Sequence, residues 1–590
     1  MEKVSVAWPT RRAVPALWGN FVSLFSSGNI LPLSVSFLAA SIIVIKIGSV
    51  VWISFLQGLH GADSAATLDN YRAVLASAGY FEILFNTLIV GAGTVLVNLF
   101  FAVPMAWLVY RTNVPFKASL VSLIAIGIAI PGYLKSIGWI LLLSPQVGLI
   151  NALFMQLFNL DQPPFNIYGL HGVVFIQGLM LTPLMFFLIA GAMHRLDPAL
   201  EEAAEVCGAR KVRTIWRVSG PLILPAIAGG AIYNLMIAVN IYDVAALIAA
   251  PARVEVVATL IFNTVKNPDV GLPQYGVASV YGIFLILPLL VALHGYSMVM
   301  KHGFKYGVVT GKGYRPKIID LGGFKYLGLG FVLFYILLAV VFPFIALVWT
   351  SFLPYIQLPS RDILSVLTLD AYRSIPAALG GFKPIMNTMI LITSAPLICL
   401  FISLMISWVS VRLYRLGGQV LDVIVMLPLA FPGVVVGVVI LYLVLRYIQP
   451  LYGTLLLLIL VEAFAMITYG TRILNAALVQ VHKELEEAAY ITGARQLKVL
   501  RRIVAPLIVP SLFLGGFWMM MMTFRNVTTA LLFYSPQNVV LSVTIWNLWD
   551  RLETGNIAAA LGVIVTVILL VLVFLIQKLG GRQLSLYSSH

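Results

Sequence analysis

Two stretches of the sequence combine acidic residues, small residues and a glycine at matching positions. The first covers residues 200–210 and the second covers residues 485–495, so each position of the second copy is numbered 285 higher than its counterpart. Glu and Ala favour helix, and Gly accepts the positive φ of a sharp turn. Each stretch therefore predicts a short polar helix, a turn and a second helix. The chemistry that these residues offer is recognition by charge.

The remaining reactive residues do not form a catalytic pattern. The seven histidines are scattered without a pair at metal-ligand spacing, and Cys207 and Cys399 are far apart. Gly311-Lys312 suggests a phosphate-binding loop, but Tyr306 and Gly313 occupy the positions that require Gly and Ser or Thr. We therefore expect no enzyme activity, no cofactor and no ATP hydrolysis by this chain. The sequence leaves a metal site unknown.

The composition is typical of a membrane protein with many spans, because 61% of the residues are hydrophobic and 10% are charged. Apolar runs long enough to cross a bilayer occur at 31–56, 83–110, 118–143, 170–192, 221–246, 274–298, 325–353, 384–411, 419–445, 452–474, 506–530 and 557–577. Most of the Lys and Arg residues fall in every second connection, which predicts cytoplasmic termini. The net charge of +15 is then a topology signal with some attraction to anionic lipid, and it does not indicate nucleic-acid binding.

Matching segments elsewhere show that the chain is duplicated. Asn86-Thr87 corresponds to Asn387-Thr388, and 129–132 corresponds to 430–433, both at an offset of 301 residues. The offset falls to 285 because the outer loop around 144–169 is longer than its counterpart around 446–451. We expect one repeat over 1–300, a cytoplasmic linker over 301–323 and a second repeat over 324–590. Six spans in each repeat predict parallel halves related by a pseudo-two-fold axis along the membrane normal.

The duplicated acidic motif resembles the EAA loop of permease subunits in binding-protein-dependent ABC importers. It covers 197–220 and 482–505 here, with Gly220 and Ala505 where the family usually has Leu. The fused, two-repeat length is most similar to the ferric-iron branch. The resemblance implies an all-α membrane protein of twelve transmembrane helices, an ABC ATPase dimer bound at the cytoplasmic face, and an external solute-binding protein as a second partner. The ATPase-coupling residues that it implies are Glu202, Ala203, Ala204, Gly208, Glu487, Ala488, Ala489 and Gly493.

Polar residues also lie on the two spans that follow these loops. Such groups within a membrane usually face the bundle interior or a wet path, so they are candidates for the pathway or gate. They are Asn234, Asn240, Asp243, Arg525 and Asn526. Interhelical hydrogen bonding is the alternative role for each Asn. We expect Asp243 and Arg525 to face one another near the outer end of the solute path, unless each reaches the outer headgroups instead.

The sequence therefore predicts a multi-pass permease of the inner (plasma) membrane that moves a small solute into the cytoplasm with energy from a separate ATPase. Ferric iron is the first choice of solute from the fused architecture. Thiamine, polyamine, phosphonate and sulfate-type solutes remain alternatives. A secondary transporter driven by an ion gradient is the alternative of another class, and the paired EAA loops argue against it.

Overall fold

The computed structural model describes residues 30–56, 66–194, 196, 198–209, 211–266, 272–303, 318–357, 363–413, 415–494 and 496–587. Within these ranges the regular elements are helices, and the sole β-type contact is an isolated bridge between Thr112 and Ile319. Most of the predicted linker, 304–317, lies outside the described residues. The all-α prediction is confirmed for the part of the chain that is described.

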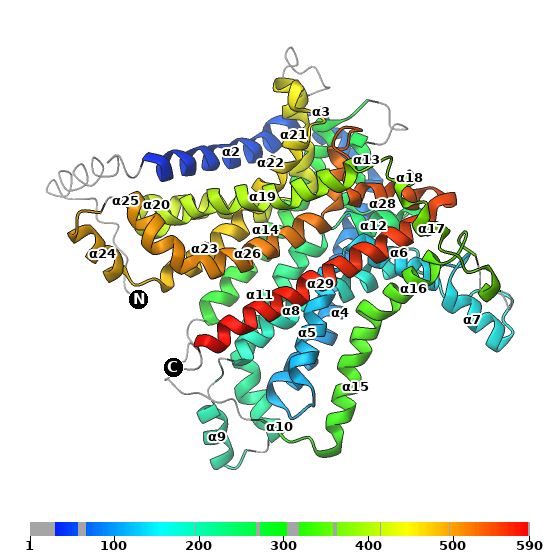
Figure 1. Cartoon of the computed structure of the whole chain (residues 1–590), viewed down its shortest axis with the longest axis horizontal. Coiled ribbons are helices and arrows are strands. Elements are labelled where there is room, and N and C mark those ends of the chain that lie inside the picture. The colour runs from blue at the N-terminus through cyan, green and yellow to red at the C-terminus, as the bar shows by residue number, and fades with distance from the viewer. Residues whose placement is uncertain are drawn as a thin grey trace. The chain divides into compact units, whose positions relative to one another are not determined.

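The first half contains helices of very different lengths, which Figure 1 shows in blue to green. They are α2 (Ile30–Ser54), α3 (Asp69–Ala76), α4 (Ala78–Arg111), α5 (Lys117–Ala129), α6 (Gly132–Leu143), α7 (Leu149–Phe158), α8 (Leu170–His194), α9 (Pro198–Val206), α10 (Lys211–Thr214), η1 (Ile215–Ser219), α11 (Gly220–Ala238), α12 (Asp243–Ile248), η2 (Ala250–Ala252), α13 (Val257–Lys266) and α14 (Tyr275–Gly303).

The second half repeats much of this order. Its elements are η5 (Gly322–Phe324), α15 (Lys325–Ile336), η6 (Leu337–Val341), α16 (Phe342–Ser351), η7 (Ile363–Val366), α17 (Asp370–Arg373), α18 (Ile375–Ala378), α19 (Lys383–Trp408), η8 (Val409–Leu413), α20 (Arg415–Met426), η9 (Leu427–Ala430), α21 (Gly433–Tyr447), η10 (Gln449–Leu451), α22 (Leu455–Ala465), α23 (Ile467–Gln480), α24 (Lys483–Ile491), α25 (Gln496–Val499), η11 (Leu500–Val504), α26 (Ala505–Arg525), α27 (Val527–Leu532), α28 (Leu541–Asp550), η12 (Leu552–Thr554) and α29 (Gly555–Tyr587).

The predicted spans correspond to long apolar helices with three differences. Nine helices of the described residues are long and apolar enough to cross a membrane, or eleven if two bent pairs are each one span. The predicted span 118–143 is broken, because α5 and α6 meet at an angle of 96°. The predicted span 452–474 lies on the second bent pair, α22 and α23, which meet at 49°. The predicted span 419–445 consists of two shorter apolar helices, α20 and α21.

Proline explains where the predicted spans 118–143 and 419–445 break. Pro131 and Pro432 immediately precede α6 and α21, and their ψ angles of 145° and 130° are extended rather than helical. Proline lacks the N–H that a continuing helix requires, and it disfavours helical geometry in the residue before it. Both breaks fall at the repeated Pro-Gly sequence, which the hydropathy of these segments does not reveal.

Contacts divide the chain into two compact units that interleave along the sequence. The first unit contains α2 up to Gly48, α19 from Ile392 onward, α20, α22 from Ile459 onward, and α23 to α26 up to Thr523. Its buried apolar cluster combines residues of α2 with residues of the second half. The cluster is Ala39, Ile43, Ile406, Val409, Leu421, Val425 and Ile467. The first span of the first repeat therefore packs on helices of the second repeat.

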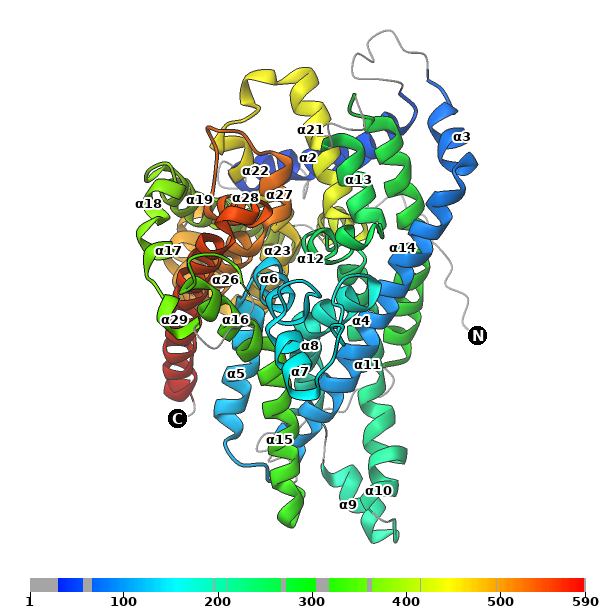
Figure 2. The ribbon, with the colours of Figure 1, turned by 90° about the vertical axis from the view of Figure 1, so that its right-hand side faces the viewer.

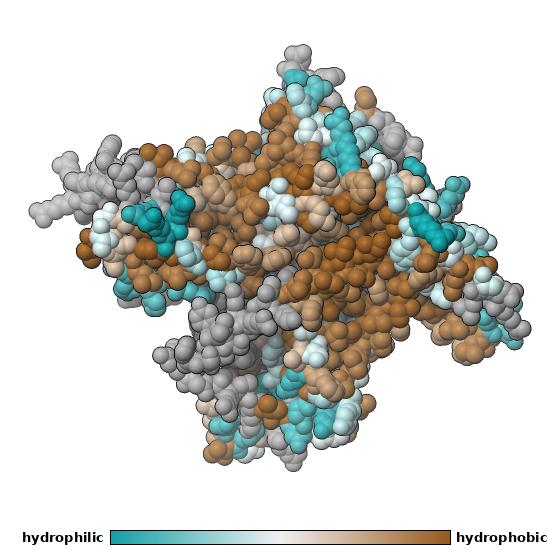
Figure 3. Space-filling model, viewed as in Figure 1, coloured by the Kyte–Doolittle hydropathy of each residue, from teal (hydrophilic) through white to brown (hydrophobic). Residues whose placement is uncertain are grey.

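The second unit contains α3 to α18, the start of α19 up to Leu391, α21 with the start of α22, and the C-terminal helices from Phe524 onward. Here the first span of the second repeat packs on the first repeat, because the Tyr335 hydroxyl donates to the Leu179 carbonyl at 3.0 Å and the Phe331 ring stacks on Phe101. Figure 2 shows this unit from the side, with α15 and α9 at one end. Figure 3 shows a continuous hydrophobic face over α29 and α16, with polar residues gathered at its margins. This surface is typical of helices that face lipid.

Candidate functional site

The two acidic stretches fold alike and confirm the predicted helix, turn and helix. In the first copy α9 is followed by a turn, by α10 and by the π-helical turn η1, which continues directly into α11. In the second copy α24, α25 and η11 lead into α26 in the same order. Figures 1 and 2 both show α9 and α10 beyond the end of the long helix α11. Each short helix thus lies at the end of a long apolar one.

A glycine with positive φ closes each short helix. Gly208 has φ of 83° and Gly493 has φ of 79°. The backbone N–H of Ala209 donates to the carbonyl of Ala204 at 3.0 Å, and that of Ala494 donates to Ala489 at 3.1 Å. These bonds satisfy carbonyls that the end of a helix leaves open, and the left-handed residue that permits them is usually Gly. The predicted turn is present at both positions.

The predicted coupling residues lie on an exposed face. Glu202, Ala203 and Gly208 are exposed in the first copy, and Glu487, Ala488 and Gly493 are exposed in the second. Ala204 and Ala489 are half-buried. Val206 and Ile491 occupy equivalent positions at the tips of α9 and α24, with 88% and 87% of their surfaces exposed. Each copy therefore presents a carboxylate and an aliphatic side chain to its surroundings.

The glutamate just before each of these exposed glutamates points the other way. Glu201 is buried and forms an ion pair with Arg111, the last residue of α4. The Ser219 hydroxyl donates a further hydrogen bond to the Glu201 carboxylate at 2.5 Å. A buried carboxylate needs such partners because removal from water is costly for a charge. Glu201 therefore fixes the inner face of α9 to the end of α4.

Glu486 makes the equivalent contact in the second copy. It is buried, and Arg412 Nε lies 2.9 Å from its Oε1 atom. Arg412 Nη2 also donates to the carbonyls of Leu478 and Val481, at 2.9 and 2.8 Å. Burial raises the pKa of the Glu486 carboxyl above its ordinary value, and the positive charge of Arg412 opposes that rise. Arg412 thus binds the end of α23 and the inner face of α24 together.

Sequence reasoning missed both ion pairs, although a signal for them was present. Arg111 and Arg412 are equivalent at the offset of 301, and Glu201 and Glu486 are equivalent at the offset of 285. Repeated charges at the ends of equivalent spans are candidates for a shared structural contact.

The three asparagines proposed for the pathway have different surroundings. Asn234 is fully buried in α11, and neither polar atom of its side-chain amide has a hydrogen-bond partner within the structure. Asn240 donates to the Met236 carbonyl at 2.6 Å. Asn526 precedes α27 and accepts from the Thr529 N–H at 3.3 Å, as an N-cap residue does. Asn526 therefore has a helix-capping role. The side-chain amide of Asn234 can still donate and accept hydrogen bonds.

Asp243 and Arg525 lie close enough for their charges to interact, and both belong to the second unit. Backbone N–H groups at Tyr133 and Val244 also face the Asp243 carboxylate. Gly132 lies directly against it, since a Cβ added there would be 2.7 Å from Asp243 Oδ2. One turn further along α6, the buried Lys135 donates to the Gly127 carbonyl at 2.6 Å. The break between α5 and α6 thus places helix N-terminal N–H groups beside an acid.

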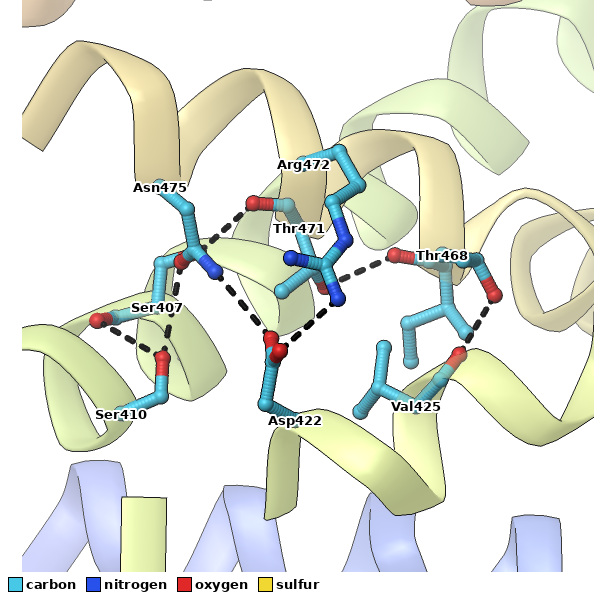
Figure 4. Close-up of polar contacts among 9 residues, drawn as sticks. Ser407, Ser410, Asp422, Val425, Thr468, Thr471, Arg472 and Asn475 are labelled. Atoms are coloured by element: carbon cyan, nitrogen blue, oxygen red, sulfur yellow. Dashed lines mark hydrogen bonds and ion pairs between the residues drawn. The ribbon is translucent and has the colours of Figure 1, made fainter. Parts of the chain in front are cut away.

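A polar cluster in the first unit was not predicted. Figure 4 shows Asp422 on α20 facing Arg472 and Asn475 on α23, with an Arg472 Nη2 to Asp422 Oδ2 distance of 2.8 Å. The Asn475 amide lies 3.4 Å from the same carboxylate. The equivalent positions of the first repeat are apolar, at Val121, Phe187 and Ala190. The two repeats therefore differ in polarity at this level of the bundle.

Metal-ligating residues do not cluster in the part of the chain that the structure describes. No group of three or more His, Cys, Asp or Glu side chains could hold an ion there.

Comparison with known proteins identifies the family. The family model described as "Binding-protein-dependent transport system inner membrane component" matches residues 94–348 and 400–585. The "Ferric transport system permease protein FbpB" of Actinobacillus pleuropneumoniae is 26% identical over 520 residues, covering 86% of this chain and 72% of that protein. The "Putative ferric transport system permease protein FbpB 1" of Haemophilus influenzae is 25% identical over 467 residues, covering 78% and 71%.

A further relative matches a shorter part of the chain. The "Putative 2-aminoethylphosphonate transport system permease protein PhnU" of Salmonella choleraesuis is 27% identical over 206 residues, covering 33% of this chain and 68% of that protein. The two separate matches of one family model agree with the internal duplication seen in the sequence. This chain belongs to the family of inner membrane components of binding-protein-dependent transport systems, which are transport subunits and not enzymes.

Proposed function

We propose that this chain is the fused permease subunit of an ATP-driven importer, which passes ferric iron from an external binding protein to the cytoplasm. The observation that carries this proposal is the matched pair of exposed surfaces on α9 and α24. Equivalent surfaces on two repeats suit a partner that itself has two-fold symmetry, as an ATPase dimer has. The absence of a phosphate-binding loop from the sequence assigns ATP hydrolysis to that partner.

The chemistry of these surfaces supports a protein partner. Val206 and Ile491 expose almost all of their apolar surface at the tips of the two helices, where water gives them no favourable contact. Glu202 and Glu487 lie on the exposed face of the same helices and offer carboxylates to cationic groups. An apolar anchor flanked by charge is the composition of a helix that inserts into a groove. Closure of the ATPase dimer would then move α9 and α24 with it.

The choice of ferric iron depends on the relatives and not on the site. Two relatives named as ferric permeases match most of this chain, whereas the 2-aminoethylphosphonate relative matches a third of it. Ferric iron is therefore favoured over a phosphonate. The charged residues around Asp243 would lie on the path, with the Asp243 carboxylate available to a cation. Paired with Arg525, it would instead hold the outer gate shut between delivery events.

Topology completes the proposal. We assign twelve spans to two parallel repeats, 1–300 and 324–590, with a pseudo-two-fold axis along the membrane normal and both termini in the cytoplasm. In this assignment α5 with α6, α20 with α21, and α22 with α23 each form one broken span, which together with the nine long apolar helices makes twelve. The distribution of Lys and Arg supports this orientation. It places both acidic motifs on the cytoplasmic side, where an ATPase can reach them.

Charge reversal at the exposed glutamates tests the coupling role. The variant Glu202→Arg with Glu487→Arg should insert normally but lose ATPase co-purification and uptake of radiolabelled ferric iron. The matched control is Asp69→Arg with Asp370→Arg, which reverses two exposed, repeat-equivalent acids of other short helices. Each variant is compared at equal abundance in the membrane.

The outcomes separate the parts of the proposal. Full uptake by the glutamate variant would contradict the coupling assignment. Retained ATPase binding without iron uptake by the unmodified chain would contradict the substrate, and 2-aminoethylphosphonate would be tested next. Uptake that survives ATP depletion but not collapse of the ion gradient would favour the secondary transporter, a class different from the family to which the chain belongs.

A further inference from the structure

The two buried ion pairs occupy equivalent places in the two repeats. Arg111 ends α4, and Arg412 lies in η8 at the end of α19, which is the equivalent helix 301 residues later. Each arginine binds the buried glutamate of the adjacent motif helix, Glu201 or Glu486. The two pairs belong to different compact units, so the structure forms the same contact twice in separate surroundings.

The N-terminal parts of α4 and α19 make a second repeated contact. The Thr87 hydroxyl accepts a hydrogen bond from the backbone N–H of Val257, the first residue of α13, at 2.8 Å. The Thr388 hydroxyl accepts one from the N–H of Leu541, the first residue of α28, also at 2.8 Å. The neighbouring amide of Asn387 donates to the Val539 carbonyl at 2.9 Å. Each threonine therefore caps a short helix that follows the long helix α11 or α26.

These contacts make α4 a continuous connection between two distant elements. Thr87 and Arg111 are 24 residues apart along α4, which corresponds to roughly 36 Å at the rise of an α-helix. The C-terminal end of α4 is fixed to α9 through Arg111, and its N-terminal part is fixed to α13 through Thr87. The helix α19 has the same two contacts through Arg412 and Thr388.

We propose that Arg111–Glu201 and Arg412–Glu486 are positioning pairs that transmit movement of the ATPase-bound helices through α4 and α19 to α13 and α28 on the outer side. This inference rests on the proposed function, because it requires an ATPase that moves α9 and α24. The exposed glutamates receive the movement, and the buried glutamates pass it to the membrane helices. The two neighbouring acids of each motif thus have separate tasks.

Burial is what suits these pairs to the task. A charge pair away from water interacts strongly, and separation of the two groups would leave each without a partner in a poorly solvated place. Such a contact resists stretching and turning, so α9 and the end of α4 must move together. An exposed pair such as Arg72 with Asp69 could be separated at little cost, since water replaces the partner.

The test removes the buried charge while it leaves the exposed surface intact. The variant Glu201→Gln with Glu486→Gln is reconstituted with its ATPase, and three quantities are measured: ATPase retention, ATP hydrolysis and uptake of radiolabelled ferric iron. We expect retention and hydrolysis to change little, and uptake per ATP to fall about tenfold, within the usual range of coupling between sites. The control is Asp69→Asn with Asp370→Asn, which neutralises two exposed, repeat-equivalent acids.

A second variant keeps the test valid if the first does not fold. Thr87→Val with Thr388→Val removes the hydroxyl acceptors in the N-terminal parts of the same helices and should lower uptake per ATP in the same way. Unchanged uptake per ATP in both variants would overturn the proposal. A parallel loss of abundance, retention and uptake in both would also overturn it, because the pairs would then be purely structural. Failure of the unmodified chain to retain an ATPase would contradict the proposed function instead.

Discussion

The glycines that end α9 and α24 allow a prediction whose size follows from the structure. Gly208 and Gly493 have φ angles of 83° and 79°, and a Cβ added to either would meet no atom within 4 Å. A substitution there is therefore opposed by the backbone conformation alone, with no contribution from collision. This separation of the two effects is uncommon, and it makes the expected order of variants clear.

A left-handed conformation costs a residue with a Cβ about 1–2 kcal/mol. We assign the lower figure to Ala and the upper figure to Val, whose β-branch adds crowding. Substitution of both glycines by Ala then costs roughly 2 kcal/mol, which corresponds to about a 30-fold weaker ATPase affinity. This is an upper limit, reached only if the substituted turn relaxes in the free permease and ATPase binding must restore the left-handed conformation. Asn tolerates the left-handed region and should cost less than Ala.

The assay is a titration of detergent-solubilised permease with its ATPase. Affinity should fall in the order Gly, Asn, Ala, Val at 208 and 493. Gly191 provides the control, because it is exposed within α8, its added Cβ also meets no atom within 4 Å, and its φ is not positive. Ala and Val at this position should leave the affinity unchanged. Equal affinities for the Gly, Ala and Val variants at 208 and 493 would show that the turn does not position the docking surface.

Two further predictions concern the charged residues of the second unit. Asp243→Arg with Arg525→Asp should restore much of the uptake that either single change removes, and a double exchange no better than the worse single change would contradict the pairing. Gly132→Ala should reduce uptake, because its Cβ would lie 2.7 Å from Asp243 Oδ2 and 2.9 Å from Met180 Sδ, whereas Gly433→Ala at the equivalent open position should be tolerated. Equal uptake by the two alanine variants would show that the Asp243 carboxylate need not stay where it is.

The sequence was sufficient for the features that depend on local pattern. The helix, turn and helix of both motifs follow from Glu, Ala and Gly at fixed spacing, and the positions of most spans follow from runs of apolar residues. Both kinds of signal lie within a single segment. The places where the spans break required a second signal, since the hydrophobicity of 118–143 and 419–445 continues through Pro131 and Pro432.

The packing partners of each span could not be predicted in this way. Apolar side chains that face lipid and apolar side chains that face another helix have the same composition, because lipid tails are as apolar as leucine. The hydropathy of the sequence therefore did not indicate that α2 contacts α19 and α20. It also did not indicate that α15 contacts α4 and α8. The exchange of first spans between repeats became visible only in the structure.

The glutamates of the two motifs show which information the structure adds to the sequence. Glu201 and Glu202 are adjacent, so they are about 100° apart around a helix, and in α9 the first is buried while the second is exposed. Leu200 and Val206 remain exposed, so the inward direction of α9 cannot be assigned from its hydrophobic residues. The buried charge instead marks that direction. Its partner is identified by the second repeat, where Arg412 and Glu486 recur at the equivalent positions. The duplication therefore provides an internal comparison. A buried ion pair found in one repeat alone could be incidental. A pair formed by equivalent residues in both repeats reflects a structural requirement that the two repeats share.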